Sequence, residues 1–478
     1  MYRGNRNYIF HTTLITFMVI AILMVIRLIP SFDFGGHGLR RADIVSDVVS
    51  KGGSDTAAVV SHAVVASGRA DGRTMPSNGK GDTLPRVMPA PVKVVRGDTS
   101  SVKGAAAKKL PKVTPIEDFS ADGSALDAFR AAMSECKNRV VRIGFVGDSF
   151  IEGDLLTGDL REYLQRRCGG TGVGFVPVTS PVSKLRRTVG HTYSGWKSYS
   201  VKRRNGAALD TCFMLSGSIS VPVDDNATVA YRVTNAKSCL KNVRQVDFFF
   251  INRGSTVIYA TVNDSMVMTF MPPSDPMIQK ITVSSPVAVS TISFDFDDVE
   301  GFYAYGASLH GPYGVQVDNF ADRGSSGLQM SKLTVTQNNR FNDINPYDLI
   351  IIEYGLNVVA TGTMRYTSFE DRMSAIVANI KRCYPGASVI IMGLSDRSSN
   401  QDGDYRTMPE VKAMIRHQRA IARKAGVAYW DTFTAMGGEN SMTEFVDKNW
   451  ASKDYTHVSA RGASVIARRL SDALMEAL

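Results

Sequence analysis

The stretch VVRIGFVGDS, residues 140–149, decides the fold. An apolar run that ends in glycine and polar residues is typical of a buried strand feeding a turn. Leucines at 155, 156, 160 and 164 follow at helical spacing. We therefore expect Ser149 between the carboxyl end of a strand and the start of a helix, where open α/β sheets place their reactive groups.

Further apolar runs continue this pattern towards the C-terminus. Four of them fit buried strands, at 315–317, 349–354, 389–392 and 427–430. Helical patterns precede or separate them, at 125–136, 369–383 and 409–425. Strands alternating with helices predict an α/β fold, here a three-layer α/β/α sandwich around a parallel five-stranded sheet.

Residues 184–301 interrupt the alternation with short runs rich in Val, Phe and Thr. Turn residues separate seven such runs, at 212–221, 228–233, 246–251, 256–262, 265–270, 280–287 and 289–296. Short strands in this number predict an inserted all-β sandwich, an architecture common among carbohydrate-binding modules. A purely structural β appendage is the alternative, since a fold does not imply a ligand.

The N-terminal part has a different composition. Residues 8–29 are almost wholly apolar, which is enough to span the hydrocarbon core, and Arg3 and Arg6 precede them. We expect a transmembrane anchor over 1–30 with a cytoplasmic N-terminus; a cleaved signal peptide is the alternative. Residues 31–115 lack sustained periodicity and predict a disordered linker.

Charge is distributed unevenly between this tail and the rest. The net charge is +10, but residues 1–115 hold 16 basic and 7 acidic residues, leaving 39 and 38 for the rest. The remaining chain therefore has no polybasic signature, and we expect no nucleic-acid partner.

The expected organisation is anchor 1–30, linker 31–115, first core part 116–183, β insertion 184–301 and second core part 302–478.

A serine nucleophile needs a base within reach and a carboxylate that orients the base. Three of the seven histidines fall in the anchor and linker, and His417, beside Arg416, fits a solvated helix face. His457 follows Asp454 at a spacing that places both on one short turn.

The five cysteines form no CxxC or His-rich spacing, so we expect neither metal nor another cofactor.

Four short blocks fall in order where the active edge of the sheet is expected. They are Gly147-Asp148-Ser149, Arg323-Gly324-Ser325-Ser326-Gly327, Gly355-Leu356-Asn357 and Asp454-Tyr455-Thr456-His457. This set resembles the SGNH (GDSL) hydrolase superfamily over residues 140–182 and 302–478. The resemblance implies an SGNH-type sandwich fold and an acyl-transfer enzyme.

The resemblance also implies a role for each site residue. Ser149 would be the nucleophile, His457 the base and Asp454 the residue that orients it. The backbone N–H of Ser149, the N–H of Gly327 and the Asn357 amide would form the oxyanion hole. Gly324 is the alternative to Gly327 as the glycine that supplies an oxyanion N–H. Val358 occupies the position after the asparagine where many relatives carry an aspartate.

The inserted β domain and the anchor extend the resemblance to bacterial peptidoglycan O-acetylesterases. We expect an extracytoplasmic (periplasmic) serine esterase at the inner membrane that removes O-acetyl groups from an envelope glycan. Its expected partners are this glycan and the lipid bilayer, with a membrane-bound acyltransferase as a further candidate. An O-acetyltransferase using the same serine and a non-catalytic glycan-binding scaffold are the alternatives.

Overall fold

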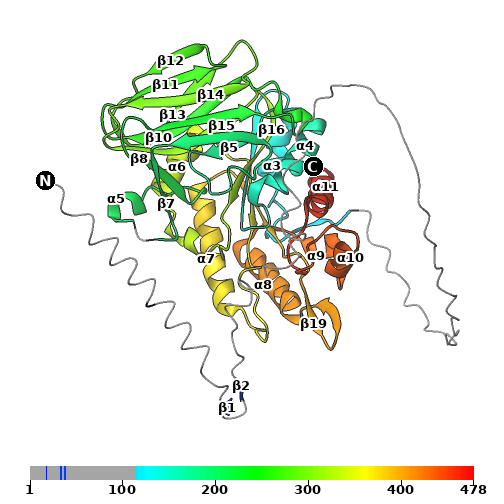
Figure 1. Ribbon diagram of the computed structural model, residues 1–478. Helices are drawn as coiled ribbons and strands as arrows, with labels where there is room; N and C mark the ends of the chain where they lie inside the picture. Colours follow the sequence, from blue (N-terminus) through cyan, green and yellow to red (C-terminus); the bar gives the residue numbers. More distant parts are fainter. Residues whose placement is uncertain (1–17, 19–32, 35–36, 39–112, 204) are drawn as a thin grey trace, which may run out of the picture. The chain divides into compact units, whose positions relative to one another are not determined.

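The computed structural model describes residues 18, 33–34, 37–38, 113–203 and 205–478 (Figure 1). It comprises two compact units, Met1–Lys103 and Gly104–Leu478. In the first, β1 (Asp33–Phe34) pairs antiparallel with β2 (His37–Gly38). Apart from Met18, the predicted anchor lies outside the described residues, as does nearly all of the linker. Within the described ranges, no helix has the length and apolar character needed to cross a membrane.

A six-stranded sheet forms the centre of the second unit. Its order is β16-β4-β17-β18-β21-β3, parallel throughout except for β3, which pairs antiparallel with β21. The bounds are β3 Ile116–Asp118, β4 Val140–Gly147, β16 Gly314–Ala321, β17 Leu349–Glu353, β18 Ser388–Met392 and β21 Ala428–Trp430. The five predicted parallel strands are confirmed, and β3 is an additional edge strand.

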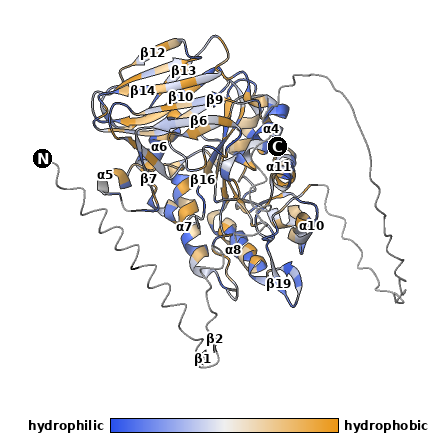
Figure 2. Cartoon of the chain, in the orientation of Figure 1, coloured by the Kyte–Doolittle hydropathy of each residue, from blue (hydrophilic) through white to orange (hydrophobic). Residues whose placement is uncertain are grey.

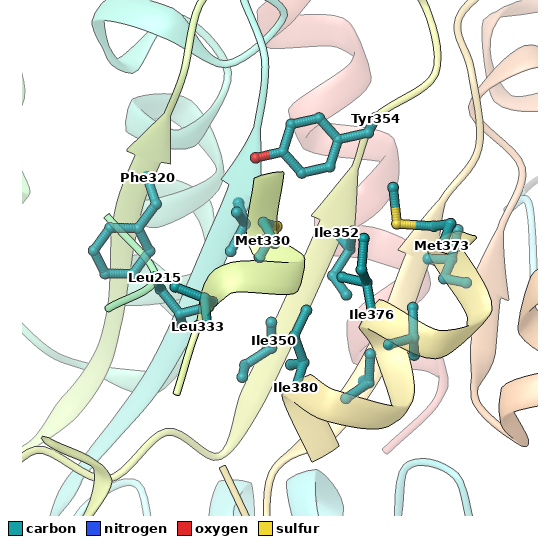
Figure 3. Packing of buried hydrophobic residues seen from close by; sticks show 14 of the residues in the cluster. Leu215, Phe320, Met330, Leu333, Ile350, Ile352, Tyr354, Met373, Ile376 and Ile380 are labelled. Atoms are coloured by element: carbon teal, nitrogen blue, oxygen red, sulfur yellow. The ribbon is translucent and has the colours of Figure 1, made fainter. Parts of the chain in front are cut away.

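Side chains of the central strands alternate between two hydrophobic cores. On β17, Ile350 and Ile352 enter one core, whereas Leu349 and Ile351 enter the other. Figure 3 shows the first of these cores, with Ile350 and Ile352 beside Ile376 and Ile380 of the covering helix. Because both faces of the sheet are covered, residues 349–352 of β17 and 389–392 of β18 are apolar on both sides, as is typical of parallel sheets.

Helices cover the two faces in separate sets. One face is covered by α6 Val335–Ile344, α7 Thr367–Cys383 and α8 Pro409–Ala425. The other is covered by α3 Asp127–Ser134, α4 Thr157–Cys168, α9 Thr432–Met436, α10 Ser441–Asp447 and α11 Ala460–Glu476. Figure 1 shows α7 and α8 on one side of the sheet and α4 and α11 on the other. Figure 2 shows hydrophobic and hydrophilic residues alternating along α7 and α8, as amphipathic covering helices require.

Two antiparallel sheets form the inserted β-sandwich. Their orders are β13-β10-β15-β8-β7, with β5 also paired to β15, and β12-β11-β14-β9-β6. The bounds are β5 Gly174–Pro177, β6 Val189–Ser194, β7 Trp196–Ser200, β8 Ser218–Pro222, β9 Thr228–Val233, β10 Gln245–Asn252, β11 Val257–Val262, β12 Met266–Phe270, β13 Asp275–Ser284, β14 Thr291–Asp297 and β15 Phe302–His310. Its paired strands therefore run from Gly174 to His310, beyond the expected boundaries 184 and 301.

The sandwich packs on the central α/β layers through the outer face of its first sheet. Phe248 and Phe250 of β10 point into the sandwich core, whereas Phe249 between them joins the core beneath α6 and α7. The Phe249 ring lies 5.1 Å, centroid to centroid, from the ring of Phe341 on α6. One hydrophobic core is thus shared by the insertion and the α/β layers, and it fixes their relative position within this unit.

Short elements complete the described chain. They are η2 Glu152–Asp154, α5 Ala207–Asp210, η3 Ser238–Leu240, η4 Leu328–Lys332 and the hairpin of β19 Ser398–Gln401 with β20 Asp404–Thr407.

Candidate active site

Ser149 lies in the turn that follows β4, at the carboxyl edge of the central sheet. β4 ends at Gly147, and α4 begins at Thr157. A side chain at Gly147 would meet Glu353 Oε2 of β17 at 2.8 Å, so the close approach of the two strand ends requires glycine there. The strand, turn and helix predicted around Ser149 are therefore confirmed, and its side chain is half-buried.

His457 and Asp454 lie in the loop between α10 and α11. The Asp454 carboxylate accepts a hydrogen bond from the His457 backbone N–H at 3.0 Å, and its other oxygen lies 2.7 Å from His457 Nδ1. Both side chains are about half exposed, at 54% for His457 and 49% for Asp454. With Nδ1 bound to the carboxylate, Nε2 is the ring nitrogen left to act as a base.

Ser149, Asp454 and His457 line one cavity of about 340 Å³. The remaining walls mix polar and apolar side chains, from Phe150, Glu152, Leu155, Arg323, Leu356, Ser452 and Val458. Across the described part of the chain, no hydrogen bond joins Ser149 to His457. The structure thus gathers the three predicted residues around one space without closing the serine–histidine contact, as is common in substrate-free enzymes.

Local hydrogen bonds keep Asp454 ionised. Partial burial acts to raise its pKa, but the His457 backbone N–H, the His457 ring and the Thr456 N–H outweigh burial and lower the pKa. An ionised Asp454 holds the histidine ring in the orientation that directs Nε2 away from the loop.

Two of the three predicted oxyanion donors, Asn357 and Gly327, already have partners in this structure. Asn357 Nδ2 donates to Asp148 Oδ2 at 2.6 Å and to the Ser325 carbonyl at 3.0 Å. The Gly327 N–H donates to Ser325 Oγ at 3.0 Å, and this glycine is packed beneath Tyr354. Gly324 is exposed, with open space around its Cα. Any oxyanion contact by Gly327 or Asn357 therefore requires that these bonds be exchanged when substrate binds.

A buried pair of carboxyl groups, absent from the sequence prediction, lies beneath Ser149. Asp148 and Glu353 are 0% and 2% exposed, and the Asp148 backbone N–H donates to Glu353 Oε2 at 3.3 Å. Burial raises the pKa of both groups, and the charge of Asp148 raises the pKa of Glu353 further, well above its ordinary value. Because their side chains also hydrogen-bond to each other, one proton must be present, and we place it on Glu353.

The Asp148 carboxylate is in turn held by donors on each side. Oδ1 accepts from the Phe150 N–H at 2.9 Å, which fixes the turn that presents Ser149. Oδ2 accepts from Asn357. The only sequence signal for this network is a glutamate at the end of the apolar run Ile350-Ile351-Ile352-Glu353.

The β19–β20 hairpin supports the histidine-bearing loop. The rings of Tyr405 on β20 and Tyr455 are stacked 3.7 Å apart at an angle of 7°. The Ser398 N–H donates to the Tyr455 carbonyl at 3.1 Å. Tyr455 has a φ of +53°, a conformation that side-chain residues rarely adopt without external support. The hairpin therefore holds Tyr455, and with it the Asp454–His457 turn, in place.

Two other histidines also have carboxylate partners, but neither lines the Ser149 cavity. His310 Nε2 lies 3.2 Å from Asp247 in a buried network, and His417 Nδ1 lies 2.6 Å from Glu370. The sequence interpretation of His417 as a solvated residue is wrong, because its ring is only 21% exposed and its Nε2 accepts from the Tyr366 N–H.

Comparison with known proteins agrees with this architecture. Residues 288–465 match the family model of the GDSL-like lipase/acylhydrolase family, a span that includes Asp454 and His457 but not Ser149. The SGNH resemblance predicted from the sequence is thereby confirmed. No protein among those with curated descriptions matches the chain.

Solved structures align with this chain to different degrees. A peptidoglycan O-acetylesterase aligns with a TM-score of 0.61 and 21% identity, over 76% of this chain and 98% of that one. A family two carbohydrate esterase from Clostridium thermocellum aligns with a TM-score of 0.26 and 10% identity, over 60% of this chain and 98% of that one. A family two carbohydrate esterase from Cellvibrio japonicus aligns with a TM-score of 0.26 and 8% identity, over 63% of this chain and 97% of that one.

We predict that Glu353→Gln changes how stability depends on pH. In the wild type, the pKa of Glu353 is higher in the folded chain than in the unfolded chain. As pH rises above about 4.5, the unfolded chain therefore loses this proton while the folded chain keeps it. Folded stability then falls by up to about 1.4 kcal/mol per pH unit until the raised pKa is passed. In Glu353→Gln the side-chain amide can still accept a hydrogen bond from the Asp148 backbone N–H and donate one to the Asp148 carboxylate, but it has no titrating proton.

The stability of Glu353→Gln relative to wild type should therefore increase with pH, as measured by denaturant unfolding from pH 4 to 8. The exposed Glu439→Gln is the control and should not show this increase. Parallel curves for Glu353→Gln and wild type would contradict a protonated Glu353.

We predict that Tyr405→Ala lowers kcat for a small acetyl ester by roughly ten- to a hundredfold, because loss of the stack lets the His457 turn shift. Tyr405→Phe keeps the stacked ring and should retain activity. Tyr313→Ala removes a comparably exposed tyrosine away from this loop and serves as the control. An unchanged kcat together with an unchanged pH–rate profile in Tyr405→Ala would show that the hairpin does not position His457.

Proposed function

We propose that this chain is a serine esterase that removes O-acetyl groups from a glycan of the cell envelope, with peptidoglycan as the expected substrate. The observation that carries the proposal is the convergence of Ser149 and the hydrogen-bonded Asp454–His457 pair on one solvent-accessible cavity. The fold shared with a peptidoglycan O-acetylesterase supports the choice of substrate.

The first half of the reaction forms an acyl-enzyme. Ser149 Oγ attacks the carbonyl carbon of the acetyl group while its proton passes to His457 Nε2. Asp454 stabilises the imidazolium that forms, through its contact with Nδ1. The tetrahedral oxyanion is bound by the Ser149 N–H, with the Gly327 N–H and the Asn357 amide as the further proposed donors. The ester bond then breaks, and the leaving sugar oxygen takes the proton from His457.

The second half consumes water. Water attacks the acetyl carbonyl of the acyl-enzyme, its proton passes to His457, and acetate leaves as Ser149 Oγ regains a proton. His457 is about half exposed, so bulk water reaches the base directly. This exposure favours hydrolysis over transfer of the acetyl group to a second sugar.

Acetyl is the acyl group we propose because the cavity walls suit a short chain. Glu152, Arg323 and Ser452 stand among its lining residues, beside a few apolar side chains. A long acyl chain would need a continuous apolar channel to bury its methylene groups.

We propose an extracytoplasmic location at the inner membrane, supported by the apolar run at residues 8–29. A further candidate partner is a membrane-bound acyltransferase.

We predict that Ser149→Ala lowers kcat for 4-nitrophenyl acetate by about 1000-fold or more, because the proposed acyl-enzyme forms on the Ser149 hydroxyl. Ser452→Ala changes a different serine of the same cavity and should leave turnover little changed. A serine-directed phosphonate should label Ser149, as read by peptide mass mapping. Loss of activity in Ser452→Ala and its retention in Ser149→Ala would overturn the assignment.

We predict that 4-nitrophenyl acetate is hydrolysed faster than the butyrate and octanoate esters, and that O-acetylated peptidoglycan releases acetate. A preference for octanoate would contradict the acetyl assignment. Acetyl transfer to a chito-oligosaccharide in place of acetate release would identify a transferase. Glycan binding without ester hydrolysis would indicate a scaffold.

We predict that full-length protein stays in the membrane fraction and that protease added to spheroplasts releases a fragment beginning within residues 31–115. Cleavage only after lysis would reverse the proposed topology.

A further inference from the structure

The turn that carries Ser149 is strained at its far end, at Asp154. Ser149 and Leu155 line the same cavity, so the turn between them forms part of the cavity wall. Within this turn, Gly153 and Asp154 both have left-handed backbones, with φ of +64° and +67°. Glycine adopts this conformation freely, whereas a residue with a side chain adopts it at a cost that surrounding contacts must offset.

Helix α4, which follows the turn, supplies one group of these contacts to the Asp154 carboxylate. Arg161 donates from Nη1 to Oδ2 at 2.8 Å and from Nη2 to Oδ1 at 3.0 Å. Thr157 Oγ1 donates to Oδ1 at 2.5 Å. The side chains of Asp154 and Arg161 are fully buried, and Arg161 also donates to the Val317 carbonyl of β16 at 2.8 Å. This ion pair is therefore fixed to the central sheet.

The β insertion supplies the other group of contacts. Thr188, the residue before β6, donates from Oγ1 to Asp154 Oδ2 at 2.6 Å and is only 6% exposed. Nη2 of Arg186 lies 3.4 Å from the same oxygen, and this side chain is also nearly buried. Arg186 donates in addition to the Phe175 carbonyl of β5 at 3.3 Å. The carboxylate at the end of the Ser149 turn is thus held jointly by α4 and by the insertion.

Both guanidinium groups keep this carboxylate ionised. Burial acts to raise the pKa of Asp154, but the charges of Arg161 and Arg186 outweigh burial and hold the pKa far below its ordinary value. An ionised carboxylate can accept from all of these donors at once. Removing one donor from a buried charged group is costly, because no water replaces it. The carboxylate should therefore respond to the loss of the Thr188 hydroxyl.

A chain of hydrogen bonds leads from Asp154 back towards Ser149. The Thr157 hydroxyl that donates to Asp154 also accepts from Asn319 Nδ2 of β16 at 2.6 Å. Asn319 Nδ2 donates in turn to the Ile151 carbonyl at 2.7 Å. Ile151 lies two residues after Ser149. A shift of the Asp154 carboxylate is therefore transmitted to the backbone that presents the nucleophile.

We propose that Thr188 and Arg186 of the β insertion are positioning residues for Ser149. They hold the Asp154 carboxylate, which holds the turn, although neither of them lines the Ser149 cavity. The insertion then contributes to the chemical step itself, with small esters as well as large ones. This inference rests on the proposed role of Ser149 as the acylated residue and needs no contact between the insertion and a glycan.

The test measures attack by Ser149 directly, as the second-order rate of labelling by a serine-directed phosphonate in the full-length chain. Thr188→Val removes the hydroxyl and keeps the shape of the side chain, and Thr188→Ser restores the hydroxyl. Arg186→Met removes the charge and provides an independent second variant. The melting temperature of each variant is measured alongside its labelling rate.

Thr282→Val controls for the loss of a threonine–aspartate hydrogen bond elsewhere in the insertion. Thr282 Oγ1 of β13 donates to the buried Asp247 at 2.7 Å. Asp247 lies 4.0 Å from Arg142, near the amino end of β4, whereas Ser149 follows the carboxyl end of that strand. This control therefore disturbs a comparable network that is remote from the nucleophile.

Thr188→Val and Arg186→Met should each lower the labelling rate about tenfold, because a displaced nucleophile is less often aligned for attack. Thr188→Ser should retain nearly the wild-type rate, and so should Thr282→Val. The pH dependence of labelling should keep its midpoint in every variant, since the Asp454–His457 pair is not altered.

The outcomes separate this inference from the proposed function. A labelling rate unchanged in both Thr188→Val and Arg186→Met would overturn the inference and leave the esterase proposal intact. An equal loss in Thr282→Val, or no recovery in Thr188→Ser, would also overturn it, because the effect would then be a general loss of stability or shape. If the wild type is not labelled at Ser149 and hydrolyses no acetyl ester, the proposed nucleophile is wrong and the inference falls with it.

Discussion

The arrangement of the site depends on one buried carboxylate, that of Asp148. It lies at the end of β4 and is bound by the Phe150 N–H of its own turn, by Asn357 from the loop after β17, and by the carboxyl group of Glu353. Through Asn357 it also connects to the Ser325 carbonyl, in the segment after β16. Three adjacent strand ends are therefore tied to the residue before Ser149. Burying this carboxylate is costly unless its oxygens are satisfied, and a proton on Glu353 supplies one more donor while avoiding a second buried charge.

The same network also holds Asn357, one of the proposed oxyanion donors, before substrate binds. An amide that donates to Asp148 and Ser325 is well positioned, but it has no spare proton for an oxyanion. In the proposed reaction, a tetrahedral oxygen beside Ser149 would compete with the Ser325 carbonyl for one of the two Asn357 N–H groups. A charged oxyanion is the stronger acceptor, so exchange is favoured in the transition state more than with the neutral substrate.

Sequence alone was sufficient where the signal is local. The five parallel strands follow from apolar runs, and the Asp454–His457 pairing follows from a spacing of three residues. Contacts between distant segments were missed: β3 pairs with β21 more than 300 residues later, and β5 and β15 join the sandwich from outside its expected limits. In the sequence, Glu353 is only the polar end of an apolar strand. Its protonated state was not predicted because it depends on Asp148, which is 205 residues away in the chain. The support of Tyr455 by Tyr405 and the contact of His417 with Glu370 have the same long-range character.

The position of the insertion in the chain explains why it reaches the site. It leaves the α/β layers after α4, which follows the Ser149 turn, and returns into β16, whose carboxyl end leads to Asp322 and Arg323. Parallel strands bring their carboxyl ends to one edge, so the segment after β16 must lie beside Ser149. β7 and β8 are held against that segment by Lys202, which bonds both Asp322 and the Arg323 carbonyl. The α/β layers thus supply Ser149, Asp454 and His457, and an insertion at this point of the topology is held beside the cavity that these residues line.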